Sequence, residues 1–449
     1  MVNSKWATAV TLLSCSLLCA QVSPDFERRL AQLENKMRQI DPSFQPPSSA
    51  ETLEARLSKL EAMFSVVLSK RMATLQNEAP QIQAIIASSH QPAPPLPLSS
   101  ANEETRLPVA GYMDFHVNKD RGEPFRPDFH RFVLLFGHSF SNRIKFWSEL
   151  EVEHSLVEGG EAKGEIALEQ AYLDFLIKPY FNLRAGMLLN PVGITNERHE
   201  PPSYNGVERP FVETFIIPTT WRELGFGATG AFGKGFRYRA YLTSALDATK
   251  FSAEMGIAEG RTSGFDASFR NPAKVARLEF AGVRRLTLGT SIYSGHTGFR
   301  LEGINPRVTI FDADGRYSWK RFDGRALFVN TWLSEAGQLN QRLRQSFGSS
   351  PNLGSQMRGY YFEPAVHLMP TRLRHDLIFF TRFERYNTQH EMPDGFRALP
   401  VFNRSAWVTG LTYKPHADVS IKFDYVFNRN SSSVLKPVDG INLGIGWWF

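Results

Sequence analysis

The sequence is almost without cysteine. Its two cysteines, Cys15 and Cys19, lie within the first 20 residues, so neither a four-cysteine zinc site nor a disulfide framework can form in the rest of the chain. The sequence also has little excess of one charge over the other, because 51 lysines and arginines against 45 aspartates and glutamates leave a net charge of +6. A surplus this small does not indicate a polycation that binds nucleic acid.

Long apolar runs are scarce as well. The mean hydropathy is −0.28, which argues against a bundle of membrane-spanning helices. Residues 6–19 form an apolar stretch that follows Lys5 and precedes Ala20, a suitable cleavage point before Gln21. The stretch is too short to span a bilayer comfortably. We expect residues 1–20 to be a secretory signal peptide, with a short N-terminal anchor or a lipoprotein signal at Cys15 as the alternatives.

Two stretches after this leader have the spacing of a coiled coil. Apolar residues recur at intervals of four and three, which places them in a narrow seam along one face of a helix. They are Phe26, Leu30, Leu33, Met37 and Ile40 in the first stretch, and Leu53, Leu57, Leu60, Phe64 and Val67 in the second. Helices this short need a partner in water. We expect residues 21–78 to form a coiled coil, the alternative being two amphipathic helices that pack on the rest of the chain.

Residues 79–106 contain the run from Pro92 to Leu98, in which four of the residues are proline. Such a composition favours an extended, semi-rigid linker. From about Leu107 the apolar residues change from a helical to a two-residue period. In residues 419–427 every odd position is apolar or aromatic, and Ser420, Lys422 and Asp424 lie between them. A soluble β-sandwich also alternates, but it does not need a dozen or more strands in one unbroken series.

The connections between these strands alternate in length. Tight links are expected near residues 139–142, 178–182, 233–235, 283–285, 320–324, 370–374 and 415–418, and long ones near residues 118–128, 191–221, 247–272, 337–356 and 390–401. Short turns at one end and long loops at the other are typical of a transmembrane β-barrel. We therefore predict an all-β fold over residues 107–449, an antiparallel transmembrane β-barrel of about 16 strands preceded by the N-terminal helical coiled-coil segment.

Two blocks of this segment carry a resemblance to a known family. Residues 169–175 read Glu-Gln-Ala-Tyr-Leu-Asp-Phe, and residues 183–193 read Leu-Arg-Ala-Gly-Met-Leu-Leu-Asn-Pro-Val-Gly. They resemble the strand–turn–strand block before the third loop of the phosphate-selective porin O and P family. The ending Gly-Trp-Trp-Phe449 is similar to the aromatic end of outer-membrane barrels generally. The resemblance implies a porin barrel, a trimer and a third loop folded into the pore; some relatives also carry an N-terminal periplasmic coiled coil.

Strand alternation assigns nearly balanced charges to the inner wall. The basic residues are Lys145, Arg184, Arg237, Arg239, Arg277, Arg316, Lys320, Arg382 and Lys422. The acidic residues are Glu149, Glu151, Glu153, Asp174, Glu223, Glu279, Asp312, Asp314, Glu384 and Asp424. No one-sided ladder of arginines is evident in this pattern, and in this respect the sequence departs from the phosphate-selective porins.

The connection over residues 191–221 is the candidate constriction. A barrel this wide encloses a water-filled channel, so selectivity requires a structure inside it. Phe215, Ile216 and Ile217 could pack on the inner wall, and opposed charges across a narrow path set ion preference. The candidate pore-lining residues are Arg184, Glu197, Arg198, Glu208, Arg209, Arg222, Arg237, Arg239, Arg277, Arg382 and Lys422. Phe449 is the expected barrel-assembly signal, because an aromatic C-terminal residue closes the last strand against the first.

Other motifs predict no further chemistry. Residues 225–230 match G-x-G-x-x-G, but strand alternation surrounds them and no helix follows. The stretch Asp312–Gly315 lacks the later ligands of a calcium loop, and the spacing and neighbours of His130 and His138 define no metal site. No local signature marks a catalytic nucleophile. We expect no enzymatic activity, no cofactor and no metal.

The function expected from these patterns is that of a bacterial outer-membrane porin. It would pass small hydrophilic solutes, with a slight preference for anions such as phosphate or carboxylates. Its partners would be outer-membrane lipid, the barrel-assembly machinery and two further copies in a homotrimer, with no nucleic acid. The alternatives are a selective transporter for an apolar or aromatic substrate, against which the polar inner faces argue, and a structural tether or adhesin.

Overall fold

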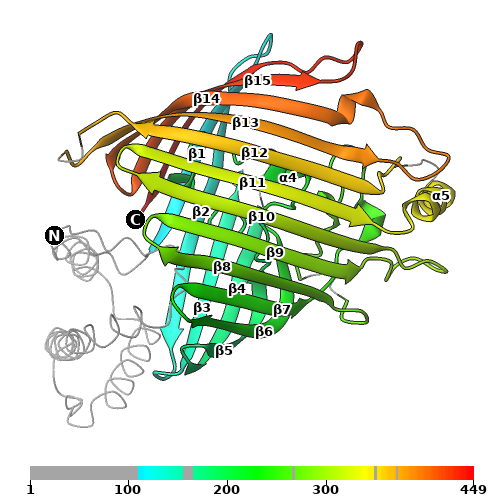
Figure 1. The fold of residues 1–449 in the computed structure, drawn as a ribbon, viewed down its shortest axis with the longest axis horizontal. Coiled ribbons are helices and arrows are strands. Elements are labelled where there is room, and N and C mark those ends of the chain that lie inside the picture. The colour runs from blue at the N-terminus through cyan, green and yellow to red at the C-terminus, as the bar shows by residue number, and fades with distance from the viewer. Residues whose placement is uncertain (1–109, 155–164, 265–267, 348–350, 371–372) are drawn as a thin grey trace, which may run out of the picture. The chain divides into compact units, whose positions relative to one another are not determined.

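A closed β-barrel makes up the described part of the chain. The computed structural model describes residues 110–154, 165–264, 268–347, 351–370 and 373–449. Within these residues sixteen antiparallel strands pair in chain order, and β1 pairs with β16 to close the sheet (Figure 1). The prediction of about 16 antiparallel strands is confirmed. The expected signal peptide, coiled coil and proline-rich linker lie outside the described residues.

The elements follow one another without crossovers. The strands are β1 (Ala110–Asp120), β2 (Arg126–Ser139), β3 (Ile144–Glu153), β4 (Glu165–Lys178), β5 (Phe181–Leu189), β6 (Arg222–Phe232), β7 (Phe236–Thr243), β8 (Ala273–Val283), β9 (Leu286–His296), β10 (Arg307–Trp319), β11 (Phe322–Leu333), β12 (Gln356–His367), β13 (Asp376–Glu391), β14 (Asn403–His416), β15 (Val419–Asn430) and β16 (Gly440–Trp448). The helices are α4 (Val212–Phe215) and α5 (Ala336–Phe347), with single 3₁₀ turns η2 (Pro201–Ser203), η3 (Ala248–Lys250), η4 (Ala258–Gly260) and η5 (Pro400–Phe402).

The strands alternate between an apolar outer face and an inner face that carries buried charged and polar side chains together with the apolar residues that pack on the loops. On β15 the rings of Phe423 and Phe427 are exposed on the outside, whereas Lys422 and Asp424, on either side of Phe423, are buried on the inside. Because the sheet is closed, the backbone N–H and C=O groups of every strand find partners on both neighbouring strands. A sheet within a membrane needs this pairing, because no water is present there to hydrogen-bond unpaired groups. Among the described residues no helix is long and apolar enough to cross a membrane.

The connections differ sharply between the two ends of the barrel. At one end, residues 179–180, 284–285, 320–321 and 417–418 form two-residue links. Arg285 and Lys320 have positive φ values of 69° and 56°, the backbone that such tight hairpins require. At the other end run the long connections 190–221, 244–272 and 334–355. The expected alternation is confirmed for most connections, although the pattern missed the connections 154–164, 297–306 and 431–439 and the helix α5. Two expectations were wrong: the connection expected to be long near residues 118–128 is the short link 121–125, and the one expected to be tight near residues 370–374 spans residues 368–375.

The barrel closes at its C-terminal residue. The Phe449 backbone donates to the Gly111 carbonyl (2.9 Å) and accepts from the Gly111 amide (3.0 Å). Its ring stacks on Phe132 with centroids 5.9 Å apart. A Cβ on Gly111 would lie 2.8 Å from the Phe449 ring, so the glycine makes room for this contact. Phe449 therefore joins the last strand to the first and covers the seam between β1 and β2.

Replacing Phe449 by alanine tests this closure. We expect Phe449→Ala to lower the yield of heat-resistant barrel, because the seam loses its aromatic cover and the chain its C-terminal aromatic residue. The measurement is the fraction of protein that runs as folded barrel without heating on a denaturing gel. Phe311→Ala, which removes an outward ring in the middle of the wall, should leave that fraction unchanged. Equal yields of the two variants would contradict a special role for Phe449.

Candidate pore constriction

The connection between β5 and β6 folds into the barrel. We call residues 190–221 the constriction loop; its helix α4 lies inside the wall (Figure 1). Val212, Ile216 and Ile217 are at most 1% exposed. The Asn196 side chain closes the base of the loop, since its amide donates to the Asn190 carbonyl (2.6 Å) and its oxygen accepts from the Trp221 amide (2.7 Å). The inward fold expected for this loop is thus the one the structure has.

Carboxylates on the far wall hold the tip of the loop. The Val207 backbone donates to Asp424 on β15 (2.6 Å), and the Val212 backbone donates to Glu384 on β13 (3.0 Å). The Asn205 side chain adds a bond to Glu363 on β12 (3.0 Å). A buried backbone N–H needs a partner, and an ionised acceptor makes the bond stronger. These bonds fix the tip of the loop, as Asn196 fixes its base, and prevent it from swinging out of the lumen.

Glu213 on α4 is the centre of a second set of bonds. Its carboxylate accepts from the backbones of Ile194 and Thr195 (2.7 Å each) and from the Tyr361 hydroxyl on β12 (2.7 Å). Burial raises the pKa of Glu213 above its ordinary value, although these three donors favour the charged form. One side chain therefore ties the two arms of the loop to each other and to the wall.

His199 fastens the loop to the near wall. Its Nε2 lies 3.0 Å from Glu169 on β4, and its Nδ1 lies 3.0 Å from the Asn196 carbonyl. Burial alone would lower the pKa of His199, but the Glu169 carboxylate outweighs burial and raises this pKa. Glu149, Glu169 and His199 have the donor atoms of a metal site, yet all three are buried beneath the loop, and Glu149 and Glu169 also accept from Tyr112 (2.9 and 3.4 Å).

Small residues on the wall let the loop come close. A Cβ on Gly446 of β16 would lie 2.3 Å from the Cβ of Pro201, and one on Gly359 of β12 would lie 2.8 Å from the Val212 side chain. Real Cβ atoms do not approach so closely, so any side chain at either position would push the loop away.

At the tip of the constriction loop, the Glu208 carboxylate accepts a hydrogen bond from the Asn118 side chain (2.9 Å) and lies 3.2 Å from the His116 ring. Burial would raise the pKa of Glu208, but the bond from His116 lowers it well below its usual range.

A second connection closes over the first. Residues 244–264, which we call the covering loop, leave β7 and reach strands that are not its neighbours. The Thr388 hydroxyl on β13 donates to the Ala253 carbonyl (2.5 Å), and Arg404 on β14 donates to the Glu254 carbonyl (2.7 Å). Arg261 of the covering loop donates to the Thr219 carbonyl of the constriction loop. The sequence indicated only that this connection is long, and length alone does not predict that a loop folds into the barrel.

Arginines gather on the wall between β5 and β10. Arg316 lies 3.2 Å from Glu279, Arg277 lies 2.7 Å from Asp314, and Arg184 pairs with Asp174 at 2.7 Å. Arg198 of the constriction loop and Arg237 of β7 approach Glu279 at 3.9 Å each. The side chains of Arg198, Arg237 and Arg316 are 28, 32 and 22% exposed, whereas that of Glu279 is 4% exposed. Around Glu279, water inside the barrel therefore meets arginine side chains more than the carboxylate behind them.

The predicted pore residues divide into two groups. Those in partial contact with water are Arg184, Glu197, Arg198, Glu208, Arg209, Arg222 and Arg237, and those sealed in buried ion pairs or under the loop are Arg239, Arg277, Arg382 and Lys422. Arg209 braces the loop itself, because it donates to the hydroxyls of Thr219 and Thr220 (2.5 and 2.6 Å). Sequence reasoning missed Glu363, although the alternation of β12 places it on the inner face with Tyr361.

Comparisons with known proteins agree on the fold. No family model matches the chain. A protein of Aquifex aeolicus (strain VF5), described as an uncharacterized protein, is 34% identical over 355 residues, 76% of this chain and 79% of the relative. The outer membrane channel DcaP of Acinetobacter baumannii has a similar structure (12% identity, 76% and 96% of the two chains, TM-score 0.52). So does Salmonella typhi OmpF in complex with daunomycin (10% identity, 76% and 97%, TM-score 0.51). At these identities the structural likeness shows the fold, that of a porin barrel.

Removing the Glu213 carboxylate tests the inward fold of the constriction loop. Glu213→Ala leaves three donors without an acceptor, and each buried donor costs about 1–3 kcal/mol. We expect the variant to lose roughly 3 kcal/mol or more of unfolding free energy and to be cut by protease within residues 190–221. The exposed Glu259→Ala, in the covering loop, should change neither quantity. A Glu213→Ala barrel as protected as the wild type would show that the loop is held by other contacts.

Proposed function

We propose that the protein is an outer-membrane porin, because its closed 16-stranded barrel has the fold of DcaP and OmpF. The chain belongs to the same protein family as the Aquifex aeolicus relative. In this proposal small hydrophilic solutes diffuse between the constriction loop and the arginine-bearing wall of β5–β10. Anions are favoured over cations. The proposal makes no use of catalysis, a cofactor or nucleic acid.

One observation carries the anion preference. Along the wall the side chains of Arg198, Arg237 and Arg316 keep partial contact with water, whereas those of Glu279, Asp312 and Asp314 are covered. A permeating ion interacts most strongly with the charges it can approach, and the low-dielectric wall enhances this interaction. The path is therefore more positive than a count of lumen charges suggests. Phosphate-like or carboxylate solutes fit this surface, and the resemblance of residues 169–193 to phosphate-selective porins agrees with it.

The proposed location is the bacterial outer membrane. An outward belt of Phe, Leu, Ile and Trp side chains covers the barrel, the surface that lipid tails require. Short turns of such barrels face the periplasm. Gly111, near the start of β1, pairs with Phe449 at the end of the barrel that carries the short turns. On this basis we place residues 21–78 in the periplasm, where a coiled coil would support a homotrimer, and we propose the barrel-assembly machinery as the partner that recognises Phe449.

A carrier for apolar substrates is the less suitable alternative. Apolar side chains do lie inside the barrel, but they pack on one another and on the two loops. Trp221 and Tyr293 are fully buried, with ring centroids 4.6 Å apart. Such a cluster is a core that holds the loops in place. A tether or adhesin would have no use for water-facing arginines on an inner wall.

Charge reversal on the wall tests the proposed path. We expect Arg198→Glu combined with Arg237→Glu to shift the reversal potential in a salt gradient toward cations. Each reversal changes the energy of a nearby ion by on the order of 1 kcal/mol or more, so the anion-to-cation permeability ratio should fall about tenfold. The measurement is planar-bilayer recording of the purified barrel.

The control carries the same change of total charge away from the lumen. Arg344→Glu combined with Arg397→Glu alters exposed positions on α5 and on the connection 392–402, and selectivity should stay at the wild-type value. Equal selectivity of the wall variant and the wild type would place the path elsewhere. Absence of any conductance in the wild type would refute the channel itself.

A further inference from the structure

Three side chains with the donor atoms of a metal site lie together near one rim of the barrel, the rim at which the long connections run. Between β1 and β2 the register shifts: Asp114 pairs with Arg131 and His116 with Asp128, so two residue steps on β1 match three on β2. An extra residue of this kind re-aims the side chains around it. As a result Asp128 lies opposite His116, and the ring of His130 stacks on that of His116 (4.6 Å, 12°).

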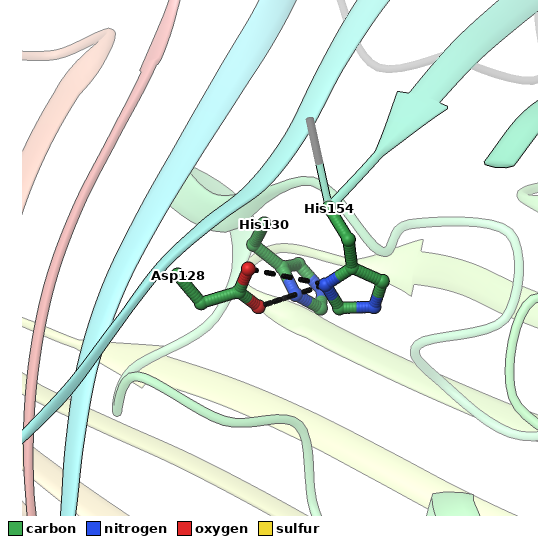
Figure 2. A group of neighbouring side chains, drawn as sticks. All are labelled: Asp128, His130 and His154. Atoms are coloured by element: carbon green, nitrogen blue, oxygen red, sulfur yellow. Dashed lines mark hydrogen bonds and ion pairs between the residues drawn. The ribbon is translucent and has the colours of Figure 1, made fainter. Parts of the chain in front are cut away.

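The third member comes from the end of β3. His154 follows the last residue of this strand, and its backbone donates to the His130 carbonyl (3.0 Å). Its φ of 51° is left-handed, a conformation that histidine adopts more readily than most residues. Figure 2 shows the side chains of Asp128, His130 and His154 pointing toward one another. The Nδ1 of His154 lies 3.0 Å from an Asp128 oxygen, and that of His130 lies 3.4 Å from the same oxygen.

These distances suit a transition-metal ion. One donor atom from each residue lies within 4.8 Å of the other two. Zinc bonds of 2.0–2.1 Å in a tetrahedron separate neighbouring ligand atoms by about 3.4 Å, so small side-chain movements would centre an ion. Two imidazoles and one carboxylate form a common zinc donor set that leaves a coordination position open for water. The side chains of Asp128 and His154 are 36 and 49% exposed, which provides a path for entry.

We propose that Asp128, His130 and His154 bind a divalent transition-metal ion of the zinc class. The second cluster, Glu149, Glu169 and His199, lacks such access because the constriction loop covers it. A bound ion would hold His130 in place against His116. The ring of His116 meets Glu208 at the tip of the constriction loop (3.2 Å), so the ion would lie beside one of the contacts that anchor this loop.

Metal titration of the purified, untagged full-length protein tests the site. After treatment with a chelator, zinc added alone should bind at one ion per chain in isothermal titration calorimetry. Cobalt(II) should give the intense visible absorption of a four- or five-coordinate site. His154→Ala and Asp128→Asn should each weaken zinc binding at least about tenfold, the order of effect expected at a metal site. His138→Ala, an exposed histidine of the same strand, should leave it unchanged.

X-ray absorption of the zinc-loaded wild type keeps the proposal falsifiable even if the variants fail to fold. Two imidazole ligands and oxygen ligands are expected. Sulfur ligands would show that the ion binds elsewhere in the chain, and would overturn the proposal. So would a wild-type protein that binds no zinc, or variants that bind it as tightly as the wild type. Channel recordings are not needed for any of these outcomes, so the site can fail without the proposed porin function failing.

Discussion

Hydrogen bonds from buried loop backbone to carboxylates across the barrel hold the interior of this protein together. Asp424 and Glu384 accept from Val207 and Val212, and Glu213 of the loop itself accepts from Ile194 and Thr195. Without these acceptors, the backbone N–H groups of an inward-folded loop would lose their hydrogen bonds to water and form none within the protein. The apolar packing of Ile216 and Ile217 and the close approach of the loop to Gly446 both depend on the loop being held inside the barrel.

The same bonds determine which charges remain available to a solute. Asp424 and Glu384, which anchor the loop, and Glu279, which lies behind arginines, are withdrawn from water. The side chains of Arg198, Arg237 and Arg316 keep part of their exposure. Around Glu279 the wall thus exposes more arginine than carboxylate surface. The anion preference we propose follows from this difference in burial. Net charge contributes little to it, because screening weakens distant charges more than those beside a narrow path.

Much of the fold was predictable from the sequence, because a barrel strand has a two-residue period that leaves its mark at every position. Residues 419–427 show it, and in the structure Phe423 faces outward and Lys422 inward as alternation requires. The tight links at 284–285 and 320–321 were predictable from the breaks in this period. Helix α5 was not, because it lies within a long connection where no strand period constrains the residues.

The sequence by itself determined the alternation, the approximate number of strands, most of the two classes of connection and most of the residues that face inward, because each is a local property of the chain. Lys320 is an exception, because it was assigned to the inner wall but lies exposed in the hairpin link 320–321. Only the tertiary structure decided which inward residues meet water. Arg382 and Lys422 are buried because loops from other strands lie over them, while Arg198 and Arg237 remain accessible. It also brought His154 to Asp128 and His130, since strand pairing and a shift of register join residues 24 or more positions apart, which their spacing along the chain does not reveal.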